Sequence, residues 1–223
     1  DGGTSWATEV SATLPTSDTL TWFDFTAATV WTPSKLSDAN FLTKASYQYS
    51  APQSTVYLDR IPVRVMYTNT KSPGSTPSGT WTDPTYAYSS NNQYANSSTD
   101  NAVQQYGTYG LSVPNGAAIV KVEVGYEAYT DGDEKINITC SWDNGNSWAT
   151  EYAGTLSSLE TLTWVDFTEA TTWTASKLSD ANFRTRVKCV IVDSASLVHL
   201  DWIPVKVTFM NTNSPGSTSA VLA

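Results

Sequence analysis

The residues of this chain that could carry out chemistry are its carboxylates, a single histidine and two cysteines. A glycosidase needs two carboxylates that face each other across a cleft, and nothing in their spacing selects such a pair. His199 is replaced by Tyr57 in a related stretch 142 positions earlier, which argues against a catalytic triad or a histidine metal site. We therefore predict no catalytic residues and no cofactor, and we expect that the protein is not an enzyme. Three aspartates also recur with this spacing: Asp24 and Asp166, Asp38 and Asp180, Asp59 and Asp201.

The acidic turn from Asp131 to Glu134 could hold a metal ion. Asp131, Asp133 and Glu134 offer carboxylate oxygens, which are the ligands that Ca²⁺ prefers. The turn lacks the twelve-residue spacing of an EF-hand loop. We predict a solvated hairpin tip here, with a calcium site at these three residues as the alternative.

Cys140 and Cys189 are too few for a four-cysteine zinc site or a disulfide-rich scaffold. Each cysteine shares the alternation parity of its apolar neighbours, in the stretches 136–140 and 187–191, so both should point into one interior. We predict a disulfide between them, with two buried free thiols as the alternative. A disulfide would indicate an oxidising compartment outside the cytoplasm.

The stretch from Ser141 to Trp148 fits the pattern S-x-D-x-G-x-x-W and resembles an Asp-box. In such a turn, Asp143 would accept backbone hydrogen bonds, Gly145 would supply a positive φ, and Trp148 would pack beneath. We predict a structural role for Ser141, Asp143, Gly145 and Trp148.

Asn96-Ser-Ser and Asn137-Ile-Thr are N-glycosylation sequons. The alternation around Asn137 places its side chain on the outward face of a strand. We predict Asn96 and Asn137 as candidate glycosylation sites.

The composition indicates a β protein with an acidic surface. Only 15% of the residues are charged, the net charge is −9, and there are 12 Tyr and 9 Trp. Aromatic side chains suit a pleated, half-buried surface, and an acidic surface repels phosphate, so nucleic acid is not an expected partner. No apolar run approaches the ~20 residues of a membrane helix. The chain has neither an initiator Met nor a signal-peptide pattern, and we expect that it is a mature or excised piece.

An internal duplication is the strongest signal in the sequence. Residues 1–76 align without a gap with residues 143–218, and 44 of these 76 positions are identical. We call the repeated segment half B and the intervening residues 77–142 half A. The predicted domains are residues 1–71 (the second half of a module), 72–79 (a Ser/Pro/Gly linker), 80–211 (a complete module) and 212–223 (a tail or linker).

Alternation with period two supports strands in both halves. Residues 118–129 alternate well in half A, and residues 198–209 alternate in half B, where Pro204 suggests an edge or a bulge. Further strands are expected at residues 19–25, 56–67 and 80–88. We predict an all-β fold of tandem β-sandwich, jelly-roll-like modules, one complete and one half.

Several short motifs are distinctive: Trp81-Thr-Asp-Pro, Gly116-Ala-Ala-Ile, Ser141-Trp-Asp-Asn-Gly, Leu178-Ser-Asp-Ala-Asn-Phe and Leu200-Asp-Trp-Ile-Pro-Val. Together they resemble a repeat module of large archaeal and bacterial cell-surface and filament proteins. The resemblance implies an exported, repetitive, non-catalytic protein. The expected location is extracellular or at the cell surface.

The unpaired half module suggests association, because it would expose apolar surface and strand edges. The first hypothesis is a structural subunit of an extracellular filament or surface layer, in which strands are exchanged between copies of this chain. The alternative is a carbohydrate-binding or adhesin module with polysaccharide as its partner, using tyrosines such as Tyr86, Tyr88, Tyr94, Tyr106 and Tyr109. The assembly candidates are Thr19, Phe25, Val56, Tyr67, Ala220, Val221 and Leu222.

Overall fold

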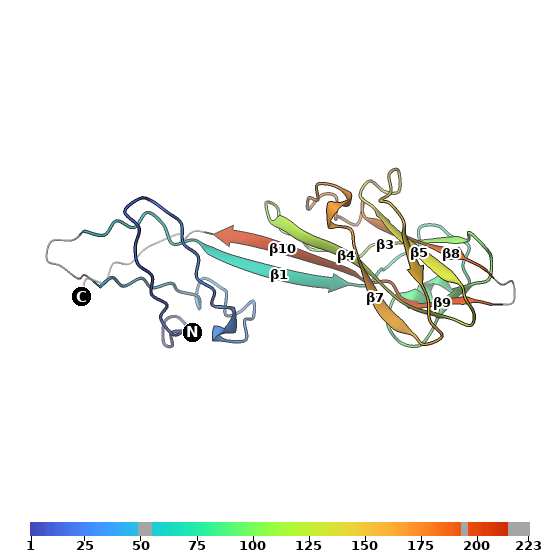
Figure 1. Cartoon of the computed structure of the whole chain (residues 1–223), viewed down its shortest axis with the longest axis horizontal. Helices are drawn as coiled ribbons and strands as arrows, with labels where there is room; N and C mark the ends of the chain where they lie inside the picture. The colour runs from blue at the N-terminus through green and yellow to red at the C-terminus, as the bar shows by residue number, and fades with distance from the viewer. Residues whose placement is uncertain (49–54, 193–195, 214–223) are drawn as a thin grey trace. The chain divides into compact units, whose positions relative to one another are not determined.

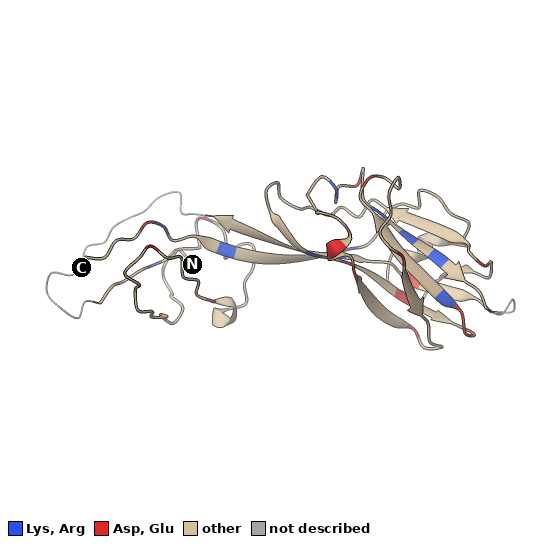
Figure 2. Ribbon diagram, turned by 45° about the horizontal axis from the view of Figure 1, so that its top comes forward, with Lys and Arg blue, Asp and Glu red and all other residues tan. Residues whose placement is uncertain are grey.

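A computed structural model describes residues 1–48, 55–192 and 196–213 (Figure 1). The chain separates into two compact units, Asp1–Ile61 (unit 1) and Pro62–Ala223 (unit 2). Within the described ranges, no helix is long and apolar enough to cross a membrane. Charged residues are sparse along the ribbon (Figure 2).

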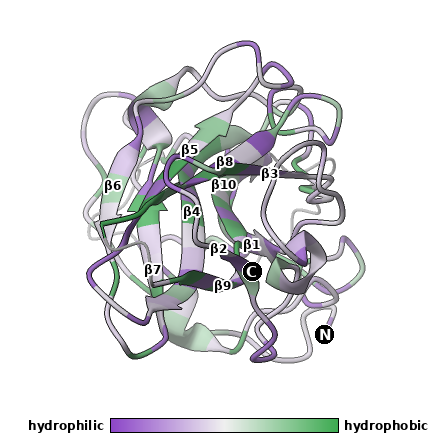
Figure 3. Ribbon diagram, turned by 90° about the vertical axis from the view of Figure 1, so that its right-hand side faces the viewer, coloured by the Kyte–Doolittle hydropathy of each residue, from purple (hydrophilic) through white to green (hydrophobic). Residues whose placement is uncertain are grey.

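Unit 2 is a sandwich of two antiparallel β-sheets, which confirms the predicted all-β class (Figures 1 and 3). Sheet A has the order β1-β10-β4-β9-β2, with β7 also paired to β4, and sheet B has the order β3-β8-β5-β6. The strands of sheet A are β1 (Val63–Lys71), β2 (Ala95–Ser97), β4 (Ala118–Thr130), β7 (Thr161–Asp166), β9 (Val198–Trp202) and β10 (Val205–Asn213). Those of sheet B are β3 (Val103–Gly107), β5 (Lys135–Ser141), β6 (Tyr152–Thr155) and β8 (Arg184–Val190). Two 3₁₀ turns, η2 (Pro84–Ala87) and η3 (Thr168–Ala170), complete the unit.

The core of unit 2 lies between the two sheets and is built from alternate positions of each strand. Burial of one aliphatic side chain of this kind contributes about 1.5–3 kcal/mol. The fully or nearly buried core residues include Val122, Val124, Tyr126 and Ala128 of β4, Ile136 and Ile138 of β5, Val187 of β8, Leu200 of β9, and Val205 and Val207 of β10.

Pro204 divides what the sequence predicted as one strand. The preceding strand β9 pairs with residues 127–130 of β4, and the following strand β10 pairs with residues 118–124 of the same strand. Pro204 has no N–H, but its carbonyl accepts the N–H of Gly125 at 2.7 Å. A Cβ on Gly125 would lie 2.8 Å from the Pro204 ring, so glycine lets the two backbones approach.

Residues 63–80 cover one edge of each sheet. Strand β1 pairs with β10 over its whole length, from Val63 opposite Asn213 to Lys71 opposite Val205. The segment 74–80 forms backbone hydrogen bonds with β3: the N–H groups of Gly74 and Ser75 donate to Gly107. The predicted linker is therefore attached to the module along most of its length.

Unit 1 repeats the sequence of half B but has no strand in its described residues 1–48 and 55–61. Its regular structure there is one 3₁₀ turn, η1 (Thr26–Ala28). The predicted strand 19–25 is therefore absent, and the strand predicted at 56–67 is found at Val63–Lys71. The counterparts of these segments in half B pair with strands of half A, and unit 1 has no half A within it.

The predicted disulfide is wrong, because both cysteines are free and buried. Cys140 lies opposite Thr185, and Cys189 lies opposite Ile136, on the adjacent strands β5 and β8. The two thiols are thus four positions apart along the ladder, roughly 13 Å, whereas a disulfide requires Cα atoms within about 7 Å. Both thiols do point into the same interior.

Candidate functional site

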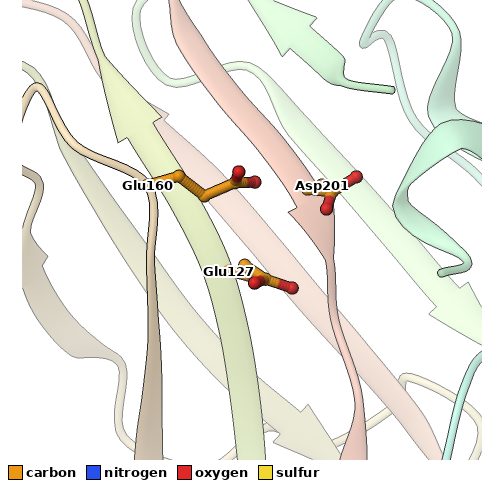
Figure 4. A group of neighbouring side chains, drawn as sticks. All are labelled: Glu127, Glu160 and Asp201. Atoms are coloured by element: carbon orange, nitrogen blue, oxygen red, sulfur yellow. The ribbon is translucent and has the colours of Figure 1, made fainter. Parts of the chain in front are cut away.

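Three carboxylates from separate elements converge on the face of sheet A that points away from sheet B (Figure 4). Glu127 comes from β4, Asp201 comes from β9, and Glu160 directly precedes β7. Their carboxylate oxygens lie within 4.8 Å of one another. We call Glu127, Glu160 and Asp201 the acidic cluster.

Alternation along the strands explains why these side chains share one face. Val124, Tyr126 and Ala128 of β4 point into the core, so Glu127 and its neighbours of the same parity point outward. On β9, Leu200 points inward, and Asp201 points to the outer face.

The acidic cluster is only partly satisfied by the residues around it. Both carboxylate oxygens of Asp201, which is 1% exposed, accept the backbone N–H of Asn91 at 3.2 and 3.0 Å. Tyr94 donates its hydroxyl to Glu160 Oε2 at 3.3 Å. Glu127 Oε2 and Glu160 Oε1 are buried and have no hydrogen-bond partner among the described residues. The cluster therefore has unused acceptor capacity.

The surroundings of Glu160 disfavour its ionised form. Burial raises the pKa of Glu160, and the nearby charges of Asp201 and Glu127 raise it further. Burial, together with the charge of Glu160, raises the pKa of Tyr94 to about 12, so its hydroxyl stays protonated as a hydrogen-bond donor.

Glu123 lies four residues before Glu127 on the same strand, and among the described residues its carboxylate, unlike those of the acidic cluster, is paired with basic side chains. It forms ion pairs with Lys121 at 2.8 Å and Lys206 at 3.0 Å. Burial alone would raise the pKa of Glu123, but these lysines hold it below its usual value. In the described part of the chain, no basic side chain forms an ion pair with the acidic cluster.

Three aromatic rings lie beside the acidic cluster on the same face. Tyr129 and His199 stack in parallel with centroids 4.4 Å apart, and Tyr94 meets Tyr129 edge-on at 5.1 Å. His199 also contacts Asp131 at 3.0 Å. We call Tyr94, Tyr129 and His199 the aromatic cluster, and all three are half-buried.

Trp164 extends the aromatic surface on the other side of the acidic cluster. Trp164 lies opposite Gly125 of β4, and the ammonium group of Lys206 lies 4.0 Å from the centroid of the Trp164 ring. Aromatic rings, a cation and free carboxylates can together stack on, and hydrogen-bond to, a polar ligand. Three carboxylates can also coordinate Ca²⁺ through oxygen.

The predicted calcium candidates do not form a group of their own. Asp131 and Asp133 are exposed, whereas Glu134 is fully buried and accepts a hydrogen bond from Thr130 Oγ1 at 2.9 Å. Among the described residues, the carboxylate group with metal-site geometry is the acidic cluster instead. Of its members, the sequence had drawn attention only to Asp201.

The stretch Ser141 to Trp148 has the hydrogen bonds that an Asp-box predicts. Asp143 Oδ1 accepts the backbone N–H of Ser147 at 2.7 Å, and Ser141 Oγ accepts that of Gly145 at 2.9 Å. Gly145 has φ +89°, and Trp148 donates its indole N–H to the Gly145 carbonyl at 2.9 Å. These contacts all lie within the turn.

Asn137 lies on the outer face of sheet B, half-buried in a charged network. It donates to Glu151 Oε2 at 3.1 Å, and Glu151 also pairs with Arg186 and Lys188. Asn96 is half-buried in β2, opposite His199. Glycosylation of either asparagine remains a prediction.

The predicted tyrosine face is only partly formed. Tyr106 and Tyr109 are buried in the core, where Tyr109 hydrogen-bonds Thr185 at 2.6 Å. Tyr94 is the member of that set that reaches the aromatic cluster. Its partners Tyr129 and His199 were not predicted as aromatic-face residues, because their contact depends on the pairing of β4 with β9.

The assembly candidates lie in different surroundings. Tyr67 is in β1, whereas Thr19, Phe25 and Val56 lie outside any strand. Ala220, Val221 and Leu222 fall outside the described residues.

No protein-family model and no curated protein matches the chain. Solved structures that align with it include one described as "CBM4 structure and function", with 8% identity and a TM-score of 0.33, covering 66% of this chain and 94% of that chain. A second is TmCBM61 in complex with β-1,4-galactotriose, with 10% identity and a TM-score of 0.25, covering 66% and 88%. A third is dimeric latent PorU from Porphyromonas gingivalis, with 8% identity and a TM-score of 0.25, covering 74% of this chain and 14% of that chain. Because these TM-scores are low, the alignments assign no ligand to this chain. The fold class of unit 2 rests on its own two sheets.

Proposed function

We propose that unit 2 is a non-catalytic carbohydrate-binding module of an extracellular protein. Its binding surface is the outer face of sheet A, formed by the aromatic cluster and the acidic cluster. The observation that carries the proposal is the pair of unpartnered carboxylate oxygens, Glu127 Oε2 and Glu160 Oε1, beside the Tyr129–His199 stack.

A sugar ring matches this surface chemically. Its apolar C–H face stacks on aromatic rings, and its hydroxyl groups donate to carboxylates in charge-assisted hydrogen bonds. The buried oxygens of Glu127 and Glu160 lack donors among the described residues, so a bound hydroxyl would supply one to each.

The test is affinity electrophoresis and titration calorimetry of the full chain against soluble polysaccharides, with β-1,4-galactotriose among the oligosaccharide probes. For a polysaccharide that the parent chain binds, Glu127→Gln and His199→Ala should each weaken binding by about tenfold, the effect of losing one good contact of about 1.4 kcal/mol. Tyr57→Ala is the matched control for His199→Ala, because Tyr57 occupies the same repeat position in unit 1 and is 91% exposed.

Two outcomes would overturn the proposal. One is the absence of binding to every polysaccharide in a panel of neutral and charged polymers. The other is binding that both variants leave unchanged. Binding that disappears with a chelator but returns with Ca²⁺ would instead assign the acidic cluster to a cation, and the sugar would then contact the ion.

A structural role is the second candidate, and one observation favours it. Strand β1 extends sheet A by pairing with β10, which is the geometry of strand addition that the filament hypothesis requires. Electron microscopy of the purified chain tests this role: regular fibres would support it, and dispersed particles at high concentration would contradict it.

A further inference from the structure

The two strands at the outer edge of sheet A are copies of each other. By the spacing of 142 positions, β1 (Val63–Lys71) is the repeat counterpart of β10 (Val205–Asn213). These two copies pair with each other in antiparallel orientation. The edge of sheet A is thus built from two copies of one repeat segment, which are identical at four of nine positions.

The register of the pair is symmetric about equivalent residues. Tyr67 lies opposite Phe209, and these two occupy the same repeat position. Every other pair consequently has a mirror pair: Val65 faces Asn211, and Val207 faces Asn69. A local two-fold axis therefore passes between Tyr67 and Phe209.

Next to this axis, β1 and β10 place side chains of the same kind opposite each other. The rings of Tyr67 and Phe209 are stacked, 5.5 Å apart and inclined by 19°. On the other face, Thr68 Oγ1 and Thr208 Oγ1 lie 3.3 Å apart, and Met66 lies opposite Met210. Directly opposed pairs of this kind are what stabilise a sheet and fix its register.

We propose that the outer edge of β10 is a self-pairing edge, which a second copy of this chain occupies whenever β1 is displaced. The second copy would present its own β10 in the same register, with Phe209 opposite Phe209 and with Thr208 opposite Met210 in place of the Thr–Thr and Met–Met pairs that β1 forms. A repeat copy of β10, strand β1, already occupies this edge. This inference is independent of the proposed carbohydrate binding.

The proposal has a consequence for a longer tandem array of these modules. With β1 displaced, each last strand has one edge turned to β4 of its own module and one edge free, and a homotypic pair consumes both free edges. Modules joined in this way must associate in twos, because no edge remains for a third.

The test displaces β1 in the full chain by the double substitution Met66→Pro and Tyr67→Pro. Adjacent residues of a strand point their N–H groups to opposite sides, so two consecutive prolines remove at least one hydrogen bond to β10. The parent chain should sediment at 24.2 kDa, and the proline variant should reach twice that mass as its concentration rises. Because unit 1 is identical in both proteins, its exposed apolar residues contribute equally to both measurements.

Cysteine cross-linking then reports the register. In the β10–β10 pair, position 208 of one copy faces position 210 of the other, so the proline variant with Thr208→Cys and Met210→Cys should oxidise to a covalent dimer. The proline variant with Thr208→Cys alone is the matched control, because its thiol faces methionine, and it should remain monomeric under the same oxidation.

A folded proline variant that stays monomeric at all concentrations would overturn the proposal. Equal cross-linking of the single- and double-cysteine proteins would overturn the register. If circular dichroism shows that the prolines unfold the module, the variant Val65→Lys with Tyr67→Lys replaces it in the test. This variant retains every backbone N–H, and it displaces β1 because it places two charges at half-buried positions.

Discussion

Residues 1–61 and residues 143–203 are copies of one repeat, yet among the described residues only the second copy contributes strands to a sandwich. Local contacts are the same in both. The indole of Trp31 donates to the Phe25 carbonyl at 3.0 Å, as Trp173 does to Phe167. Trp31 and Phe41 meet at 5.8 Å and 55°, and their counterparts meet at 5.9 Å and 54°.

The two segments differ in what covers them. Phe167 is 6% exposed, whereas its counterpart Phe25 is 41% exposed, and Trp6 is 50% exposed in unit 1. Half A supplies β4 and β5, and these central strands pair with β7, β8, β9 and β10 of half B. Turns and local aromatic contacts therefore follow from local sequence, whereas strands need a partner strand.

Adding a second copy of half A to the chain should change the structure of unit 1 more than any other variant proposed. A chain with a second copy of residues 77–142 fused before Asp1 should form a second sandwich. We expect a clear gain in β-sheet signal by circular dichroism and added slow-exchanging amides within residues 1–61. A fused chain whose residues 1–61 exchange as fast as in the parent would show that half A is not what unit 1 lacks.

A cavity in the core should lower the free energy of unfolding by several kcal/mol in unit 2, whereas the same substitution in unit 1 should not. Phe183 is 1% exposed, and Phe183→Ala should lower the free energy of unfolding of unit 2 by about 3–5 kcal/mol. The matched variant Phe41→Ala changes the same repeat position in unit 1 and should leave that transition unchanged. Urea unfolding followed by tryptophan fluorescence measures both, and equal losses would contradict the comparison.

Thiol reactivity tests the difference in burial between the two units at another repeat position. Burial raises the pKa of Cys189 to about 12 and that of Cys140 further still, so neither thiol should react with a disulfide reagent in the native protein. Tyr47 is the counterpart of Cys189 and is 53% exposed. A Tyr47→Cys chain should therefore react with one equivalent at a rate orders of magnitude faster, and fast reaction of the parent chain would argue against the buried thiols.

The smallest expected effect is the pH dependence of Glu160. Its pKa is higher in the folded state than in the unfolded state, so its contribution to stability is full below the unfolded value, near 4.5, and is lost as the pH rises through the raised value. Glu160→Gln should thus raise the melting temperature slightly at pH 7 and have little effect near pH 4. Asp18→Asn removes a carboxylate at the exposed counterpart position in unit 1 and is the matched control.

Much of this fold follows from the sequence alone. The duplication predicted the two halves, and the alternation in residues 118–129 predicted β4 almost to the residue. The stretch 80–88 was predicted as a strand but contains η2, because Pro84 and the left-handed Asp83 favour a tight turn. The disulfide prediction had the correct inward parity but lacked the strand register, which parity cannot supply.

The candidate site was harder to predict for the same reason. Glu127, Glu160 and Asp201 come from positions far apart in the sequence, and β4 pairing with both β7 and β9 brings them together. Glu127 belongs to half A and has no repeat counterpart, so a search among recurring acids could not find it. The strand parity of Tyr129 could have indicated an outward aromatic ring.

The antiparallel register of β1 and β10 also determines how unit 2 responds to tension. Val63 and Asn213 lie opposite each other at the same end of the ladder. A force that pulls the chain apart between the residue before Val63 and the residue after Asn213 loads one hydrogen-bonded pair at a time. The ladder therefore opens like a zipper at low force, releasing the nine residues of β1 while the sandwich stays closed, and it can reform when the load is removed.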